Sequence, residues 1–314
     1  MISLISLSRP SLSSLEAKQL NNTMKAELDF IFYNRLEKTG SQSMTRLINA
    51  LGKRNNFGTY RNVIVPKTSP IETFEEETEF IEQLMELERP SAYVEHANYM
   101  NFTQHDTPKP IYINLVRHPI QKVISAYYYQ RHPVIYANTL LRNKNKKKDK
   151  IYFDRTFNDC VKQRVAPFCV FDSHNEFNND WRRFSLHLCG NEEICTYFNS
   201  EIATQKAKDN VEREYAVIGS WEDTNITLAV LEAYIPRFFK DAKKVYYKQT
   251  PEFTVNTTPH DTHLDEEVEE YLQRSFHFEI ELYQFIKQRL YKQYIAINKQ
   301  KMQQEYENKS YQLK

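Results

Sequence analysis

One stretch, Phe30 to Ser43, constrains the fold of this chain most, because it combines a strand, a tight polar loop and the beginning of a helix. Its first four residues are apolar or aromatic, as a buried strand requires. From Met44 to Leu51 the apolar residues recur at helical spacing. A lysine and a glycine, Lys38 and Gly40, lie between the two patterns. Backbone N–H groups at a helix N-terminus beside a lysine form an anion site, although a serine acting as an ordinary N-cap would also fit the spacing.

A second unit of the same kind spans residues 111–131. The run Ile111 to Val116 is almost continuously apolar, which indicates a strand that is buried on both faces, as in a parallel sheet. Pro119 suits the first turn of a helix that follows this strand. The repeated alternation predicts an α/β fold in which ligands bind at the carboxyl ends of the strands.

The remaining pattern predicts one large domain, which a chain of 314 residues is long enough to form. Residues 1–27 are rich in serine and predict a flexible stem, the domain spans 28–298, and 299–314 form a polar tail. Further elements are predicted as follows: helices at 73–88, 199–214 and 224–239, one long helix from 264, an extended segment at 92–96, and short strands at 62–65, 215–219 and 244–247.

The glycine pattern excludes two familiar nucleotide loops. In a Walker A loop a glycine precedes the lysine, whereas here Lys38 precedes Gly40. A dinucleotide-binding loop needs three closely spaced glycines, and the five glycines of this chain are far apart. The order Lys-Thr-Gly-Ser-Gln-Ser after a strand instead resembles the 5′-phosphosulfate loop of sulfotransferases that use 3′-phosphoadenylyl sulfate (PAPS).

Cysteines and glycosylation motifs bear on the compartment. The four cysteines form two close pairs without zinc-site spacing, and we expect disulfides between Cys160 and Cys169 and between Cys189 and Cys195. The candidate N-glycosylation sites are Asn21, Asn101, Asn225, Asn256 and Asn308. Together these features favour the secretory lumen. The first seven residues are too short for a signal peptide or a membrane span, so we expect the targeting element to be absent from this chain or missing from an incomplete gene model.

Several motifs in a fixed order carry a family resemblance. They are residues 33–35 with 38–43, residues 109–114 with Arg117 and Pro119, Ser125 with residues 127–129, residues 189–195, and residues 215–223 with 231–233 and 236–239. On these motifs the chain resembles the uronosyl 2-O-sulfotransferases of the heparan sulfate and dermatan/chondroitin type, and most of all their insect Pipe branch.

The resemblance implies a P-loop-like sulfotransferase fold, with a central parallel sheet flanked by helices, over residues 28–298. It implies PAPS-dependent transfer of a sulfuryl group to the 2-O position of a uronic acid in a glycosaminoglycan or related glycan, without a metal. It further implies a homo-oligomer, a trimer in the family, that does not bind nucleic acid. The expected location is the Golgi lumen, as a type II membrane protein.

The resemblance also assigns roles within the site. His96 would be the base that deprotonates a sugar hydroxyl, and Lys38 would neutralise charge that develops during transfer. The 5′-phosphosulfate would be held by Lys38, Thr39, Gly40, Ser41, Gln42 and Ser43. The 3′-phosphate would be bound by Arg117 and Ser125, and a later cofactor loop is matched by Tyr246, Thr257 and Thr258.

The acceptor would be a polyanion, and a net charge of +1 means that local basic patches must bind it. The candidates are Arg35, beside the loop; Lys146, Lys147 and Lys148, in a basic run; and Arg182 and Arg183, near the cysteines. For the lysine run, a solvated loop tip is the alternative interpretation.

Three positions depart from the family pattern. Val94 lies where the heparan sulfate enzymes have a second histidine, His118 replaces the aspartate of Arg-Asp-Pro, and Glu37 puts a negative charge beside the cofactor loop. Three hypotheses therefore stand. The chain is an active glycan 2-O-sulfotransferase, an impaired relative that only binds sulfated glycan, or an unrelated cytosolic enzyme that acts on nucleotide phosphates.

Overall fold

The computed structural model describes residues 16–64, 71, 73–143, 147–166, 169–171, 183–249 and 263–312. Within this part of the chain one sheet forms, with the strand order β2-β3-β1-β4-β5. All neighbouring strands are parallel. The strands are β1 (Phe30–Asn34), β2 (Gly58–Arg61), β3 (Ser91–Glu95), β4 (Ile111–Val116) and β5 (Tyr215–Ser220). The predicted α/β fold with a central parallel sheet is therefore confirmed.

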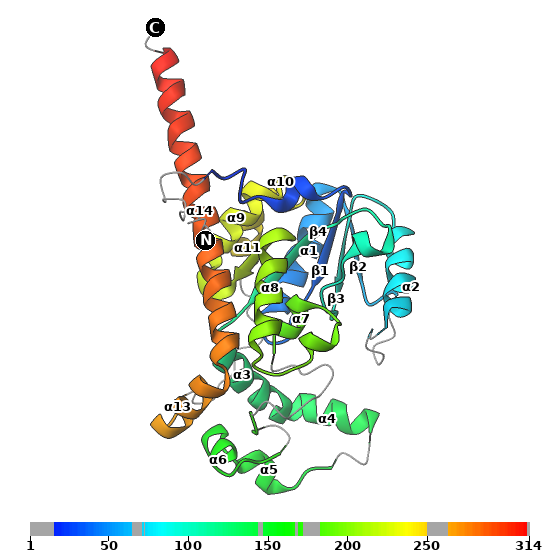
Figure 1. Ribbon diagram of the computed structural model, residues 1–314, viewed down its shortest axis with the longest axis vertical. Coiled ribbons are helices and arrows are strands. Elements are labelled where there is room, and N and C mark those ends of the chain that lie inside the picture. The colour runs from blue at the N-terminus through cyan, green and yellow to red at the C-terminus, as the bar shows by residue number, and fades with distance from the viewer. Residues whose placement is uncertain are drawn as a thin grey trace, which may run out of the picture.

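Helices cover both faces of this sheet (Figure 1). The helices before the cysteine region are α1 (Ser41–Asn55), α2 (Phe74–Met85), α3 (Pro119–Arg131), α4 (Pro133–Arg142), α5 (Lys150–Asp154) and α6 (Phe157–Lys162). The later helices are α7 (Ser185–Cys189), α8 (Glu201–Arg213), α9 (Thr224–Tyr234), α10 (Pro236–Phe239), α11 (Ala242–Lys248), α13 (Glu266–Ser275) and α14 (His277–Gln312). Short 3₁₀ turns are η2 (Asn22–Lys25), η3 (Phe102–His105), η5 (Glu193–Cys195) and η6 (Trp221–Asp223).

Strands β1, β3, β4 and β5 are buried along their whole length and are mostly apolar, as expected of a sheet covered on both faces, whereas β2 lies partly exposed at the edge of the sheet. In β1, Ile31 and Tyr33 pack with α1, α9 and α10, whereas Phe30 and Phe32 pack with α2, α7 and α8. Helix α14 runs along the molecule and contributes to both clusters, and its last part extends away from the body (Figure 1). A third, smaller cluster joins α3, α6 and α13. Since β1 lies between β3 and β4, the loops that follow these three strands meet at one edge of the sheet.

Two predicted strands are wrong. The segment 244–247 lies in helix α11, where Val245 and Tyr246 pack on the cluster under α1 and α9. Four residues are too few for their spacing to separate a strand from one helical turn. The strand predicted at 62–65 is β2, four residues earlier, because Asn62 has a φ of 50° and cannot continue an extended strand.

The predicted helix boundaries also need correction. The helix expected at 224–239 is divided at Ile235, before Pro236. The long helix expected from 264 is broken at Phe276, whose side chain is fully buried in the third cluster. Residues 299–312, for which a polar, frayed end of the long helix was expected, continue α14 as a helix.

The predicted boundary between stem and domain at residue 28 is wrong as well. The side chain of Asn22 is buried and donates hydrogen bonds to the carbonyl oxygens of Glu212 and Tyr215, at 2.7 and 3.0 Å. From α14, Gln293 donates to the carbonyl oxygen of Leu20. The described residues from 16 onward therefore belong to the folded domain.

Candidate active site

The loop between β1 and α1 has a backbone that is already shaped for an anion. Lys38 and Gly40 have φ angles of 60° and 84°, and Thr39 Oγ1 donates to the carbonyl oxygen of Leu36 at 3.1 Å, which closes the turn. Helix α1 begins at Ser41, so its first N–H groups have no acceptor within the helix. These groups and the helix dipole favour a negatively charged ligand at this end.

A cavity of about 380 Å³ opens at this loop, at the carboxyl edge of the sheet. It is lined by Arg35, Glu37, Lys38, Gly40, Ser41, Gln42, Ser43, His96, Arg117, Ser125, Tyr129, Trp221 and Tyr246. The residues come from the ends of several strands and from α1, α3 and α11. The fold thus brings together most of the cofactor and catalytic residues predicted from sequence. Thr39 is buried beneath the loop, and Thr257 and Thr258 lie outside the described residues.

The cavity concentrates positive charge that is partly shielded from water. Desolvation and the charge of Arg117 lower the pKa of Lys38 to about 8. The Lys38 ammonium group lies 3.8 Å from the centre of the Tyr129 ring. Desolvation also lowers the pKa of Arg117, against the opposing effect of Glu222. Lys38 and Arg117 thus place two positive charges in one cavity that is partly shielded from water, which suits an anion with more than one negative charge.

His96 follows β3 and is held by a residue of the first loop. Its Nδ1 lies 3.1 Å from the carbonyl oxygen of Arg35, and its Nε2 lies 2.9 Å from Arg35 Nε. An arginine nitrogen can only donate, so Nε2 accepts and the ring proton sits on Nδ1. Desolvation and the nearby Arg35 charge lower the pKa of His96 well below its ordinary value. The imidazole is therefore neutral, which is the form that a base requires.

The structure describes all three positions that depart from the family pattern. The backbone N–H of His118 donates to Glu222 Oε1 at 3.1 Å, and the same carboxylate acts on the pKa of Arg117. Glu222 thus supplies a negative charge near Arg117 although position 118 is a histidine. Val94 is 1% exposed and packs in the core. Glu37 is exposed, and its charge partly opposes the lowering of the Lys38 pKa.

Sequence reasoning missed two aromatic residues of the cavity. Trp221 Nε1 donates to the carbonyl oxygen of Gly40 at 2.9 Å, and its ring stacks on Tyr246 with 5.1 Å between centroids. Tyr129 lies one helical turn after Ser125, on the same side of α3. Two signals could have identified them: Trp221 directly follows a strand at the ligand-binding edge, and Tyr129 follows Ser125 at a spacing of four.

The predicted glycan-binding residues that the structure describes differ in burial. Arg35 lines the cavity, whereas Lys147 and Lys148 are exposed on the loop before α5. The prediction for Arg183 is wrong, because its side chain is fully buried and donates to the carbonyl oxygens of Cys195 and Thr196. Lys146 and Arg182 lie outside the described residues.

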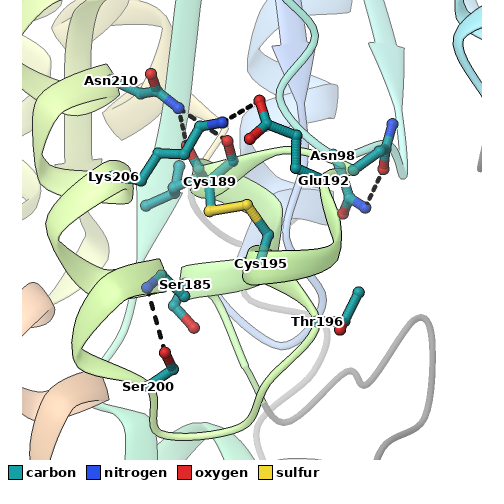
Figure 2. Close-up of a disulfide and its surroundings, with 12 residues drawn as sticks. Asn98, Ser185, Cys189, Glu192, Cys195, Thr196, Ser200, Lys206 and Asn210 are labelled. Atoms are coloured by element: carbon teal, nitrogen blue, oxygen red, sulfur yellow. Dashed lines mark hydrogen bonds and ion pairs between the residues drawn. A yellow bond between two sulfur atoms is a disulfide. The ribbon is translucent and has the colours of Figure 1, made fainter.

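Both expected cysteine pairs are disulfides in the structure, Cys160–Cys169 and Cys189–Cys195. Figure 2 shows the second one, which ties the end of α7 to η5 beside α8. From α8, Asn210 donates to the carbonyl oxygen of Cys189 at 3.0 Å, and Lys206 pairs with Glu192. The bridge therefore fastens a loop-rich segment to the domain.

The glycosylation motifs differ in exposure. Asn225 and Asn308 are exposed, Asn21 and Asn101 are partly exposed at the starts of η2 and η3, and Asn256 lies outside the described residues. Over the part of the chain that the structure describes, no helix is both long and apolar enough to cross a membrane. Within the same residues, no group of three or more His, Cys, Asp or Glu side chains is arranged to hold a metal ion.

Comparison with known proteins matches a family described as "Sulfotransferase family" over residues 21–286. The chain is 42% identical over 292 residues to the uronyl 2-sulfotransferase homolog pip of Drosophila melanogaster, which covers 91% of this chain and 57% of that protein. It is 28% identical over 237 residues to heparan sulfate 2-O-sulfotransferase 1 of Homo sapiens, covering 74% of this chain and 62% of that protein. The matched part thus spans less than two thirds of the length of either relative.

Proposed function

Because this chain belongs to the sulfotransferase family, we propose that it transfers a sulfuryl group from PAPS to the 2-O position of a uronic acid in a glycosaminoglycan or related glycan. One observation carries the proposal: a single cavity contains Lys38, the N-terminus of α1, Arg117 and the neutral His96. An anion site and a base in one cavity are what transfer from an anionic donor to a hydroxyl group requires.

The residues of the cavity fit such a donor. The φ of Gly40 and the close approach of Trp221 keep that position free of a side chain, so the backbone N–H groups of α1 can face a 5′-phosphosulfate. Arg117 and Ser125 offer a guanidinium and a hydroxyl group to a 3′-phosphate. The stacked pair Trp221 and Tyr246 suits a purine ring.

When bound, PAPS would supply the sulfuryl group for an in-line displacement. His96 would take the proton of the acceptor hydroxyl at Nε2, because its Nδ1 proton is engaged with the Arg35 carbonyl oxygen. Lys38 would stabilise the negative charge that develops on the oxygen of the leaving group. Partial burial strengthens this effect, since a charge acts more strongly where water is excluded.

We also propose that the protein works in the lumen of the secretory pathway, in the Golgi. The two disulfides support this, because such bonds persist in oxidising compartments. A homo-oligomeric state, a trimer in the family, remains a prediction.

The test is a binding and transfer assay on the purified chain. We expect PAPS to bind and radiolabelled sulfate to appear on a glycosaminoglycan at the uronic acid 2-O position. Lys38→Ala should reduce turnover by about 10²–10³, the loss typical of removing one charge-stabilising group. Lys53→Ala, an exposed lysine on the last turn of α1, is the matched control and should retain full turnover.

Each outcome separates the hypotheses. Normal turnover by Lys38→Ala would refute the assignment of the loop. PAPS or glycan binding without transfer to any uronic acid would favour the impaired, glycan-binding relative. Absence of PAPS binding would contradict the proposal as a whole.

A further inference from the structure

Arg35 makes two contacts with His96 that act in opposite senses. Its backbone carbonyl oxygen accepts from Nδ1 and so fixes the tautomer in which Nε2 is the base. Its side-chain Nε donates to that same Nε2 at 2.9 Å and so occupies the lone pair that would take a proton. A neutral imidazole has one such lone pair, and a guanidinium does not lose its proton in a protein. In this arrangement the base is correctly oriented, but the lone pair that would accept the proton is occupied.

The guanidinium of Arg35 is also incompletely bonded. The residue is 5% exposed, and among the described residues its Nη1 has no hydrogen-bond partner. An unpaired, buried donor on a charged group is unfavourable. The side chain borders the cavity of about 380 Å³, so an oxyanion in the cavity would offer it better acceptors than the imidazole does.

We propose that Arg35 is a gate that the acceptor itself opens: an oxyanion of the glycan, carboxylate or sulfate, draws the guanidinium away from His96 Nε2, and only then can Nε2 accept the hydroxyl proton. This inference rests on the proposed function. Arg35 is thus a positioning residue that couples recognition of an acidic sugar to release of the base.

Transfer takes place once Arg35 has moved away from Nε2. The hydroxyl O–H bond breaks and its proton moves to Nε2. The electron pair of that bond forms the new S–O bond as the S–O bond to the 5′-phosphate of the donor breaks, and the electrons of the broken bond leave with that phosphate. His96 then releases its proton to water. Movement of Arg35 toward an oxyanion also spares the newly charged imidazolium from an adjacent positive charge.

The gate accounts for selectivity in two directions. A neutral sugar brings no oxyanion, so Arg35 stays on Nε2 and the hydroxyl proton has no acceptor. A water molecule in the cavity also finds the Nε2 lone pair occupied. His96 therefore cannot deprotonate that water, which protects a bound donor from hydrolysis.

Other charged or titratable groups also face His96. Arg61 is the last residue of β2, Lys122 lies on α3 and His187 lies on α7. Arg35 donates a hydrogen bond to Nε2, whereas Arg61 lowers the pKa of His96 through its charge. Arg61→Gln is therefore the matched control, since it removes a nearby positive charge and keeps the contact between Arg35 and Nε2.

The first experiment follows His96 by ¹⁵N NMR in the full chain, without donor or glycan. Arg35→Met should raise the pKa of His96 and move the Nε2 resonance to that of a free lone pair, whereas Arg61→Gln should keep the Nε2 resonance of the original protein. Arg35→Leu, which likewise has no side-chain donor, should also free the lone pair and serves if Arg35→Met does not fold. An unchanged Nε2 resonance in a folded Arg35 variant would overturn the proposal.

The second experiment compares three acceptors. The first carries a carboxylate, the second carries a sulfate and has its carboxyl group reduced, and the third carries neither charged group. The original protein should turn over the acceptor with neither group at least tenfold more slowly than the better charged one. Arg35→Met should raise kcat on this neutral acceptor about tenfold, which corresponds to about 1.4 kcal/mol. The two charged acceptors show which oxyanion opens the gate.

These measurements separate the gate from a simple binding role and from the proposed function. If Arg35 only binds glycan, Arg35→Met raises KM for charged acceptors and leaves kcat on the neutral acceptor unchanged, which would overturn the gate. If the original protein transfers sulfate to no glycan, the proposed function fails, and the NMR experiment still decides whether Arg35 holds His96.

Discussion

Replacement of Gly40 by alanine is expected to damage the site by two separate mechanisms. Gly40 has a φ of 84°, in the left-handed region that residues with a Cβ rarely adopt. A Cβ at this position would lie 2.1 Å from Cδ1 of Trp221 and 2.7 Å from its Nε1. The indole would have to leave the loop, and it would then lose its stacking on Tyr246.

The loss in free energy of unfolding has three parts, one from the backbone and two from the indole. The left-handed backbone costs an alanine about 1–2 kcal/mol. Displacement of the indole loses its hydrogen bond to the Gly40 carbonyl oxygen, about 0.5 kcal/mol at a solvent-exposed position, and its stacking on Tyr246, about 0.5–1.5 kcal/mol. Gly40→Ala should therefore lower the free energy of unfolding by about 2–4 kcal/mol.

The assay is equilibrium unfolding in urea, carried out as a double-mutant cycle with Trp221→Ala. Without the indole, the cost of Gly40→Ala should fall to the backbone part, about 1–2 kcal/mol. Gly58→Ala is the control, because its φ is not in the left-handed region, and it should cost less than about 1 kcal/mol. Equal costs of Gly40→Ala with and without the indole would refute the contact argument.

Three further predictions follow from the cavity, the basic run and the disulfide. Because the pKa of Lys38 is about 8 and its cationic form is needed, kcat/KM for PAPS should fall as the pH rises through about 8; in Lys38→Arg, a pH–rate series should no longer show this fall. Neutralisation of Lys146–Lys148 should raise KM for glycan at low salt and leave PAPS affinity unchanged, and equal effects on both ligands would assign the run to an ordinary solvated loop. Replacement of Cys189 and Cys195 by alanine should cost about 2 kcal/mol in urea unfolding, as expected for a short closed loop, and an unchanged midpoint would contradict a stabilising role.

The parts of this protein that the sequence alone determines are those set by neighbours along the chain. The strand and helix around Lys38 and Gly40 follow from apolar spacing over residues 30–51, and both are found where the spacing predicts them. The almost continuous apolar run of β4 indicated burial on two faces and therefore a parallel sheet. The anion-binding character of the loop and the position of His96 after an extended segment could also be predicted from neighbouring residues.

Only the tertiary structure decided which distant residues meet. Arg35 and His96 are 61 positions apart, and Gly40 and Trp221 are 181 positions apart, so no local pattern links either pair. Arg183 carries a charge that suggested a surface role, but carbonyl groups of the η5 segment make its burial possible. The segment 244–247 and Phe276 took their conformations from the clusters against which they pack. Periodicity reports which residues prefer to be buried, whereas the partner that buries each of them depends on how the whole chain packs.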